Sequence, residues 1–180
     1  MYELIILGFL MRSVSHGYRI AKIINDMIGP YAKVSSGRLY PLFDKLAQDG
    51  FIAMVQGDED ATRQRQYEIT EKGRQRFHQL MMDTSTNLGE YRKLFGFKFV
   101  FIDLLLPDEQ LYLLDHFMNY CQTHIFYINS EIEDLKSRES EIGVNMWASL
   151  AIMEQTKSQW QLELQWATKS REQLKLKNSN

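Results

Sequence analysis

Residues 35–52, SSGRLYPLFDKLAQDGFI, form the segment that most constrains the fold of this chain. Apolar residues recur here at helical spacing and therefore share one face of a helix: Leu39, Leu42, Phe43 and Leu46. Ser35 or Ser36 can cap the start of this helix, and Gly50 suits a left-handed residue just past its end. Taken alone, the pattern fits a helix that enters a DNA groove, but it is more typical of a solvated surface helix.

Pro41 lies inside this predicted helix. Proline has no backbone N–H, so the hydrogen bond to the carbonyl of Gly37 is lost. Local rules therefore predict that the regular helix begins near Tyr40. A distorted first turn that runs through Pro41 is the alternative, because Gly37 has no side chain to crowd the proline ring.

The flanking segments have the order of a winged helix-turn-helix domain. Residues 2–11 are an apolar run that favours a buried helix, and Ser15 offers an N-cap for a second helix that stops at Gly29 and Pro30. Residues 51–56 and 64–69 have the composition of two strands around a polar loop. Thr70 can cap a further helix. Three helices followed by a hairpin place the third helix in the major groove.

The second half of the chain predicts long helices. Pro107 followed by two acids is a helix-start signature, and residues 91–106 favour a buried helix, with a strand as the alternative. Beyond them, apolar residues repeat about every 3.5 positions, as in coiled coils. A last helix is expected over residues 144–174. We expect a second copy of the chain to cover these stripes through Leu111, Leu114, Met118, Cys121, Ile125, Ile128, Ile132, Leu135 and Leu164.

These patterns predict a mainly α fold with two domains. The first, over residues 1–88, is a winged helix-turn-helix DNA-binding domain. The second, over residues 89–180, is a helical, coiled-coil-like domain for dimerisation and effector binding.

The charge distribution favours a DNA contact in the first domain only. The net charge of the chain is −2, yet six cations and two acids lie between Arg12 and Lys45. The single cysteine, Cys121, excludes an internal disulfide framework. No apolar run reaches membrane-spanning length, so we expect a soluble cytoplasmic protein. With no glycine-rich phosphate loop and no nucleophile–base spacing, we expect neither an enzyme nor a cofactor.

Three segments of the chain resemble the PadR family of bacterial transcriptional regulators: HGYRIAKII at residues 16–24, SSGRLYPLFDKLAQDGFI at 35–52 and QYEITEKGR at 66–74. FIDLLLPDEQ at residues 101–110 resembles part of the longer C-terminal domain found in one branch of this family. That branch includes the phenolic-acid repressors and the AphA-type activators. The resemblance implies a dimeric winged-helix protein on a dyad-symmetric operator. In phenolic-acid repressors of this family, a small aromatic acid releases the protein from DNA upstream of a decarboxylase gene. The resemblance also implies that the helix at residues 35–48 continues through Pro41.

The expected DNA contacts come from three elements. The third helix offers cations to bases or phosphates, although solvated cations are the alternative. The second helix would cross the backbone, and the return side of the hairpin would reach the minor groove, since the wing tip at residues 57–60 is acidic. The set is Tyr18, Arg19, Lys22, Ser35, Ser36, Gly37, Arg38, Tyr40, Lys45, Arg63, Gln64 and Arg65.

An aromatic effector cavity is a second expectation. Its residues would hold a small carboxylate beside aromatic rings, although a packed dimer core is the favoured explanation of them: Tyr120, His124, Tyr127, Trp147 and Trp160. No metal site is expected, because His116, Cys121 and His124 diverge around the helix and no carboxylate completes a ligand set.

Three functions remain open from the sequence. The first is a repressor that responds to a phenolic acid. The second is an AphA-type activator without a small ligand. The third is a winged-helix module for protein–protein assembly.

Overall fold

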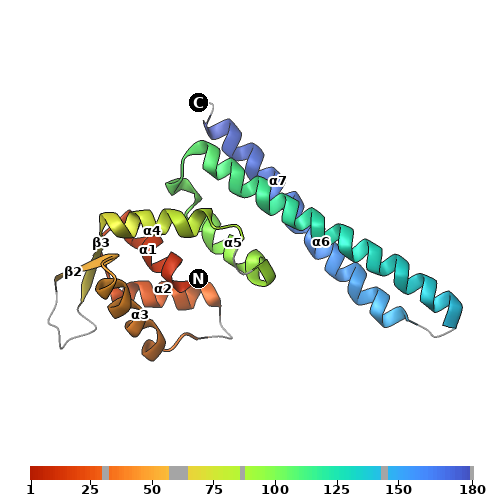
Figure 1. Cartoon of the computed structure of the whole chain (residues 1–180), viewed down its shortest axis with the longest axis horizontal. Helices are drawn as coiled ribbons and strands as arrows, with labels where there is room; N and C mark the ends of the chain where they lie inside the picture. Colours follow the sequence, from red (N-terminus) through yellow and green to blue (C-terminus); the bar gives the residue numbers. More distant parts are fainter. Residues whose placement is uncertain (30–32, 57–64, 86–87, 143–145, 179–180) are drawn as a thin grey trace. The chain divides into compact units, whose positions relative to one another are not determined.

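The computed structural model describes residues 1–29, 33–56, 65–85, 88–142 and 146–178. The chain divides into two compact units, Met1–Leu105 and Leu106–Asn180 (Figure 1). The predicted mainly α fold is confirmed, with a winged helix in the first unit and a long helix pair in the second. The first unit runs past the expected boundary at residue 88, because the helix that follows packs with the N-terminal elements.

The first unit has the predicted order of helices and strands. Its elements are α1 (Tyr2–Arg12), β1 (Ser15–His16), α2 (Gly17–Ile28), α3 (Ser36–Gln48), β2 (Ile52–Gln56), β3 (Gln66–Ile69), α4 (Glu71–Met82), η1 (Leu88–Glu90), α5 (Tyr91–Val100) and η2 (Ile102–Leu104). Thr70 caps α4 as expected, since its Oγ1 accepts from the backbone N–H of Gly73 at 3.0 Å. The helix predicted over residues 91–106 is α5, and it ends at Val100 before the η2 turn.

The sheet contains a strand that the sequence did not predict. Its order is β1-β3-β2, and both neighbouring pairs are antiparallel. Ser15 pairs with Tyr67 inside β1, so the prediction that Ser15 caps the second helix is wrong. His16 holds the N-cap position instead. The N–H of Gly17 donates to the carbonyl of Arg65 at 3.2 Å, which fixes the start of α2 against β3.

Helix α3 begins at Ser36 and continues through Pro41. The prediction that regular helix starts near Tyr40 is therefore wrong, and the expectation from the family resemblance is confirmed. The backbone N–H groups of Arg38 and Leu39 both donate to Ser35 O, at 3.0 and 3.2 Å, so the first turn closes before the proline. Pro41 then costs a single bond near Gly37, which is exposed to solvent. Ser35 holds the N-cap position, but its side chain makes no capping hydrogen bond.

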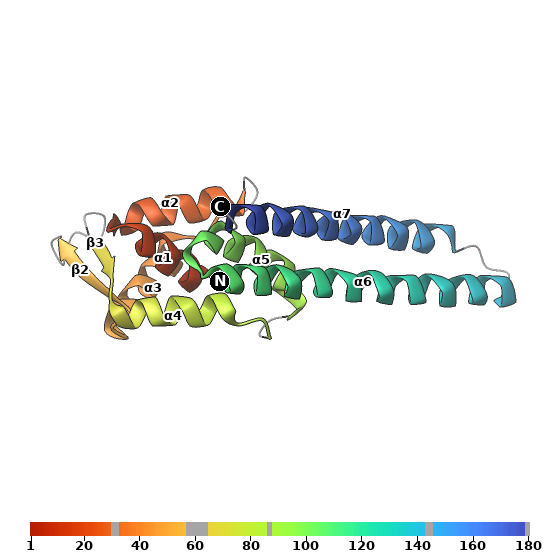
Figure 2. The same ribbon diagram turned by 90° about the horizontal axis from the view of Figure 1, so that it is seen from above.

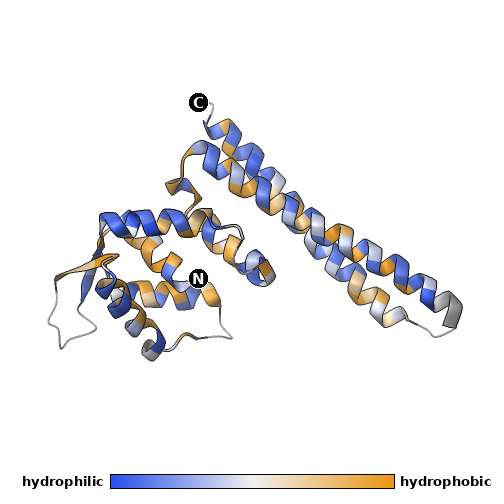
Figure 3. Ribbon diagram, in the orientation of Figure 1, coloured by the Kyte–Doolittle hydropathy of each residue, from blue (hydrophilic) through white to orange (hydrophobic). Residues whose placement is uncertain are grey.

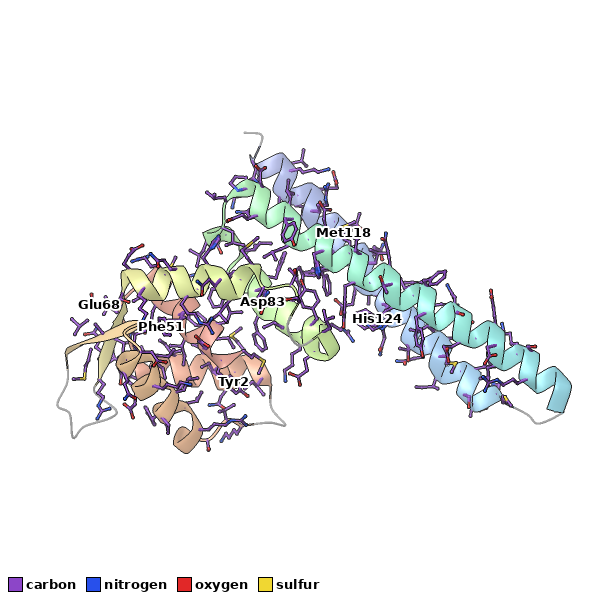
Figure 4. The ribbon with its side chains drawn as sticks, in the orientation of Figure 1. Tyr2, Phe51, Glu68, Asp83, Met118 and His124 are labelled. Carbon is purple, nitrogen blue, oxygen red and sulfur yellow. The ribbon has the colours of Figure 1, made fainter. Side chains whose placement is uncertain are left out.

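Two glycines end α2 and α3 as predicted. Gly29 has φ +96° and Gly50 has φ +74°, both in the region that favours glycine. Beyond Gly50 the chain passes through Phe51, which Figure 4 labels, and enters the sheet at Ile52, the first residue of β2.

The core of the first unit is built around α1 and Phe101. Leu4, Ile5, Ile6 and Leu7 are buried, and α1 contacts α2, α4, α5 and β3. The ring of Phe101 meets those of Phe9 and Phe77 edge-on, with centroids 5.2 and 6.0 Å apart. A guanidinium N–H of Arg12 donates to Val100 O at 3.0 Å and to Asp103 Oδ1 at 2.8 Å. These contacts hold α5 and η2 in the N-terminal unit.

Lys98 is a buried cation in this unit, with 1% of its surface exposed. Its Nζ donates to the backbone carbonyl of Asp83 and lies 5.8 Å from the centroid of the Tyr91 ring. Burial lowers the pKa of Lys98 to about 8, while the Asp83 carboxylate acts in the opposite direction. The ammonium form is therefore penalised in the folded chain.

This burial predicts that the fold gains stability in mild alkali. Between pH 8 and 10 the unfolded chain keeps the Lys98 proton, which the folded chain has released, so the free energy of unfolding rises with pH. The gain is about 2 kcal/mol between pH 7 and pH 10. Urea titrations of the wild type and Lys98→Met at both pH values measure this gain, because the variant has no titrating group at position 98. Parallel pH curves for the two proteins would contradict the prediction.

The second unit is a helical hairpin of α6 (Pro107–Ile142) and α7 (Trp147–Asn178). Both views show the two helices side by side along their length (Figures 1 and 2). Pro107, Asp108 and Glu109 begin α6 as predicted. Arg171 on α7 holds the Asp115 carboxylate in two bonds, Nε to Oδ1 at 2.5 Å and Nη2 to Oδ2 at 3.0 Å. The expected start of the last helix at residue 144 lies outside the described residues.

Hydrophobic and hydrophilic residues alternate along both helices (Figure 3). Within one chain, α7 already buries much of the predicted heptad seam: Leu114, Cys121, Ile128 and Ile132. The others are half-buried: Leu111, Met118, Ile125, Leu135 and Leu164. All nine of these residues were expected to contact a second copy of the chain. The four buried residues instead belong to packing inside the chain.

Candidate nucleic-acid interface

Helix α3 is buried on one face and open on the other. Leu39, Phe43 and Leu46 have at most 2% of their surface exposed, as the apolar spacing predicted. The opposite side exposes Gly37, Arg38, Pro41, Asp44 and Lys45. The exposed face therefore offers two cations and one carboxylate to a partner.

The start of α3 is braced by α1. The Arg38 guanidinium lies 5.7 Å from the centroid of the Tyr2 ring, which Figure 4 labels on α1. Ser35 is exposed and Tyr40 is half-buried, with its ring centroid 6.5 Å from that of Phe43. The side chain of Ser36 lies outside the described side chains.

The expected contacts on α2 share one exposed surface. Tyr18, Arg19 and Lys22 are all exposed at the start of the helix. The Nε–H of Arg19 donates to the Tyr18 hydroxyl at 3.3 Å. A phosphate at this position would meet one phenol and two cations.

Arg65 is engaged by the protein. Its Nη1 donates to Asp44 Oδ1 at 2.9 Å, and its side chain is 20% exposed. The hydrogen bond with Tyr67, and the Asp44 carboxylate after it, raise the pKa of the guanidinium. Arg63, Gln64 and the acidic residues 57–60 lie outside the described residues. Sequence reasoning named Arg65 but missed its partner, because residues 44 and 65 are distant in the chain.

A groove of about 420 Å³ lies between α3 and α4. Its apolar lining includes Leu46 and Phe51. The Nζ of Lys72 donates to Asp49 O at 2.8 Å, and the Nε of Arg76 donates to Glu3 Oε1 at 2.7 Å. These two lining cations thus hold partners within the chain.

In the second unit, three of the five expected effector residues form one cluster. The rings of His124 and Trp160 stack with centroids 4.2 Å apart and 4° between their planes. Tyr120 meets both edge-on, at 4.6 and 5.5 Å (Figure 4 labels His124). Burial raises the pKa of Tyr120 and lowers that of His124. Tyr127 and Trp147 have 60% and 73% of their surfaces exposed, so the five residues do not enclose one cavity.

The described residues form neither a metal-ligand cluster nor a membrane-spanning helix. No group of three or more His, Cys, Asp or Glu side chains there is placed to hold a metal ion. None of the helices there is both long enough and apolar enough to span a membrane.

Comparison with known proteins identifies the family. The family model described as "Transcriptional regulator PadR-like family" matches residues 6–79. A transcriptional regulator from Clostridium thermocellum is 31% identical, over 43% of this chain and 75% of that one, with a TM-score of 0.37. The chain belongs to the PadR-like family of transcriptional regulators. This is a family of DNA-binding regulators, not of enzymes.

Two solved PadR structures match nearly the whole chain at lower identity. Bacillus subtilis PadR in complex with operator DNA is 19% identical, covering 96% of each chain, with a TM-score of 0.40. The PadR-like regulator BC1756 from Bacillus cereus is 20% identical, covering 98% of this chain and 99% of that one, with a TM-score of 0.40. No curated protein sequence matches.

The structure draws attention to one further residue on the candidate interface of this PadR-like regulator. Asp44 is the only acid between residues 36 and 48, and it lies on the exposed side of α3. A sequence search for DNA contacts favours cations and passes over a carboxylate. Only the fold shows that Asp44 forms an ion pair with Arg65, the residue just before β3.

Proposed function

We propose that this PadR-like regulator is a homodimeric cytoplasmic repressor that a small phenolic acid releases from a dyad-symmetric operator. Each protomer would place α3 in the major groove. The observation that carries the DNA part is the exposed side of α3, where Arg38 and Lys45 lie on a helix whose other face is packed through Leu39, Phe43 and Leu46. Guanidinium and ammonium groups at this position can bind guanine edges or phosphates.

The other expected contacts surround α3. Tyr18, Arg19 and Lys22 would bind phosphates beside the groove, with Ser35, Ser36, Gly37 and Tyr40 at the helix start. Backbone N–H groups and hydroxyls at a helix N-terminus suit this role.

A gel-shift assay tests the DNA-binding part. The probe is the promoter fragment upstream of the chain's own gene and its neighbour. We expect retardation that weakens steeply as salt rises, because phosphate contacts release counterions. A protein–protein assembly module would leave every fragment unshifted, including at low salt. Reporter expression with and without the gene then separates a repressor from an AphA-type activator.

Exposed apolar side chains on the helix pair support the dimer. Phe126, Leu162 and Leu176 have 77%, 67% and 70% of their surfaces exposed, and the half-buried part of the heptad lies on the same two helices. Such residues are typical of a surface that a partner covers. Light scattering at micromolar concentration is expected to give twice the chain mass of 21.3 kDa. A mass of one chain would contradict the dimer.

The ring cluster of Tyr120, His124 and Trp160 supports the effector part. A phenolic acid could stack on these rings, and an imidazole could bind its carboxylate. One relative, B. subtilis PadR, is described in complex with p-coumaric acid.

Titration with p-coumarate or ferulate tests the effector. The ligand is expected to quench tryptophan fluorescence with saturation, and Trp160→Phe should remove most of the quenching. Trp147→Phe is the matched control, since Trp147 lies largely in solvent and outside the cluster. Linear, unsaturated quenching in all three proteins would show that neither acid binds.

A further inference from the structure

The Asp44 carboxylate occupies an unusual place for an acid. It projects from the exposed side of α3, with 59% of its side chain accessible. If α3 enters a DNA groove, this carboxylate faces a surface lined with phosphates. An uncompensated acid there would repel every DNA sequence alike.

The fold supplies the compensation from outside the helix. Arg65 Nη1 donates to Asp44 Oδ1 at 2.9 Å. The guanidinium is itself held, because Arg65 is hydrogen-bonded to Tyr67 and its carbonyl accepts from Gly17 N at 3.2 Å. Tyr67 is 3% exposed, and its ring stacks on Phe43 of α3 with centroids 5.2 Å apart. A chain of contacts therefore runs from Phe43 on the buried face of α3 to Tyr67 on β3, and through Arg65 to Asp44 on the exposed side of α3.

We propose that Asp44 is a specificity-determining residue of the DNA interface and that Arg65 is a positioning residue that acts through it. The pair is neutral together, so it adds no repulsion from phosphates. Arg65 contacts one oxygen of the Asp44 carboxylate, Oδ1. Among the described residues, none donates a hydrogen bond to the other oxygen, Oδ2. An oriented carboxylate in the major groove accepts from the amino group of cytosine. The inference rests on the proposed placement of α3 in the groove, and it assigns Arg65 a role other than direct DNA contact.

The test is a double-mutant cycle of Asp44→Ala, Arg65→Gln and both together. Two probes are used: short duplexes of random sequence, and the duplexes that the wild type selects from that pool. Arg65→Gln should weaken binding to random duplexes about fivefold, since Asp44 is then an unshielded charge near phosphates. Adding Asp44→Ala should restore that binding. A double variant as weak as Arg65→Gln would show that Arg65 contacts DNA itself and would overturn the proposal.

Asp44→Ala alone tests specificity and does not depend on how Arg65→Gln folds. We expect the ratio of affinities for selected and random duplexes to fall about tenfold. Asp26→Ala, an exposed acid on α2, is the control for the change in net charge and should leave the ratio unaltered. An unchanged ratio in Asp44→Ala would overturn the specificity role. A wild type that binds neither probe would instead refute the proposed function.

Discussion

Gly73→Ala is expected to lower the free energy of unfolding by about 3 kcal/mol. Gly73 is buried in the first turn of α4, and a Cβ there would lie 1.9 Å from the backbone oxygen of Phe51 and 2.8 Å from Ile69 Cγ1. That oxygen cannot move freely, because it accepts from the N–H of Thr70 at 3.1 Å and from the Thr70 hydroxyl at 3.1 Å. Space for the methyl group requires that α4 shift away from the sheet.

Gly96→Ala is the matched control, because a Cβ at this exposed position in α5 would meet nothing within 4 Å. It is expected to be neutral or to stabilise by up to about 1 kcal/mol, since alanine favours helix. Urea denaturation followed by circular dichroism measures both variants. Equal midpoints for the two variants would contradict the close packing of α4 on Phe51, the residue before β2.

The Arg38→Ala and Lys45→Ala double variant is expected to lose affinity for the selected duplex on the order of a hundredfold. Each residue is an exposed cation on α3, and each would contribute a base or phosphate contact. The slope of affinity against salt should become shallower by about two, one unit for each lost phosphate contact. Neither side chain is buried, so the fold should persist even though the Arg38 contact with the Tyr2 ring is lost.

Lys136→Ala with Arg138→Ala is the control for charge, because both residues are exposed on α6 and outside the proposed interface. Fluorescence anisotropy over a range of salt concentrations measures both double variants. Should the α3 variant bind as tightly as the α6 control, the recognition role of α3 would be rejected.

Local signals predicted the parts of the fold that local physics determines. Thr70 and Gly50 are capping residues whose roles depend on nearby backbone, and both appear where the sequence placed them. The buried face of α3 follows from helical spacing alone. Pro41 shows the limit of such rules, since the first turn closes on Ser35 before the proline removes a bond.

Long-range pairing could not be predicted in the same way. The strand β1 exists because residues 15 and 16 meet β3, more than forty positions away, and two residues carry no periodic signal. The heptad of α6 predicted that a helix would cover it, and that helix was expected from a second copy, whereas α7 of the same chain packs along α6. The ion pair of Asp44 and Arg65 has the same origin in tertiary structure. Within the effector hypothesis, Tyr120, His124 and Trp160 meet, whereas Tyr127 and Trp147 point to solvent.

Hydroxyl-radical footprinting on the promoter fragment of its own gene tests whether this PadR-like regulator binds DNA as a dimer through α3. Protection of two segments related by dyad symmetry is expected, with both lost in the Arg38→Ala and Lys45→Ala variant. Uniform cleavage along the fragment at protein concentrations that saturate a gel shift, or protection that survives in the double variant, would contradict it.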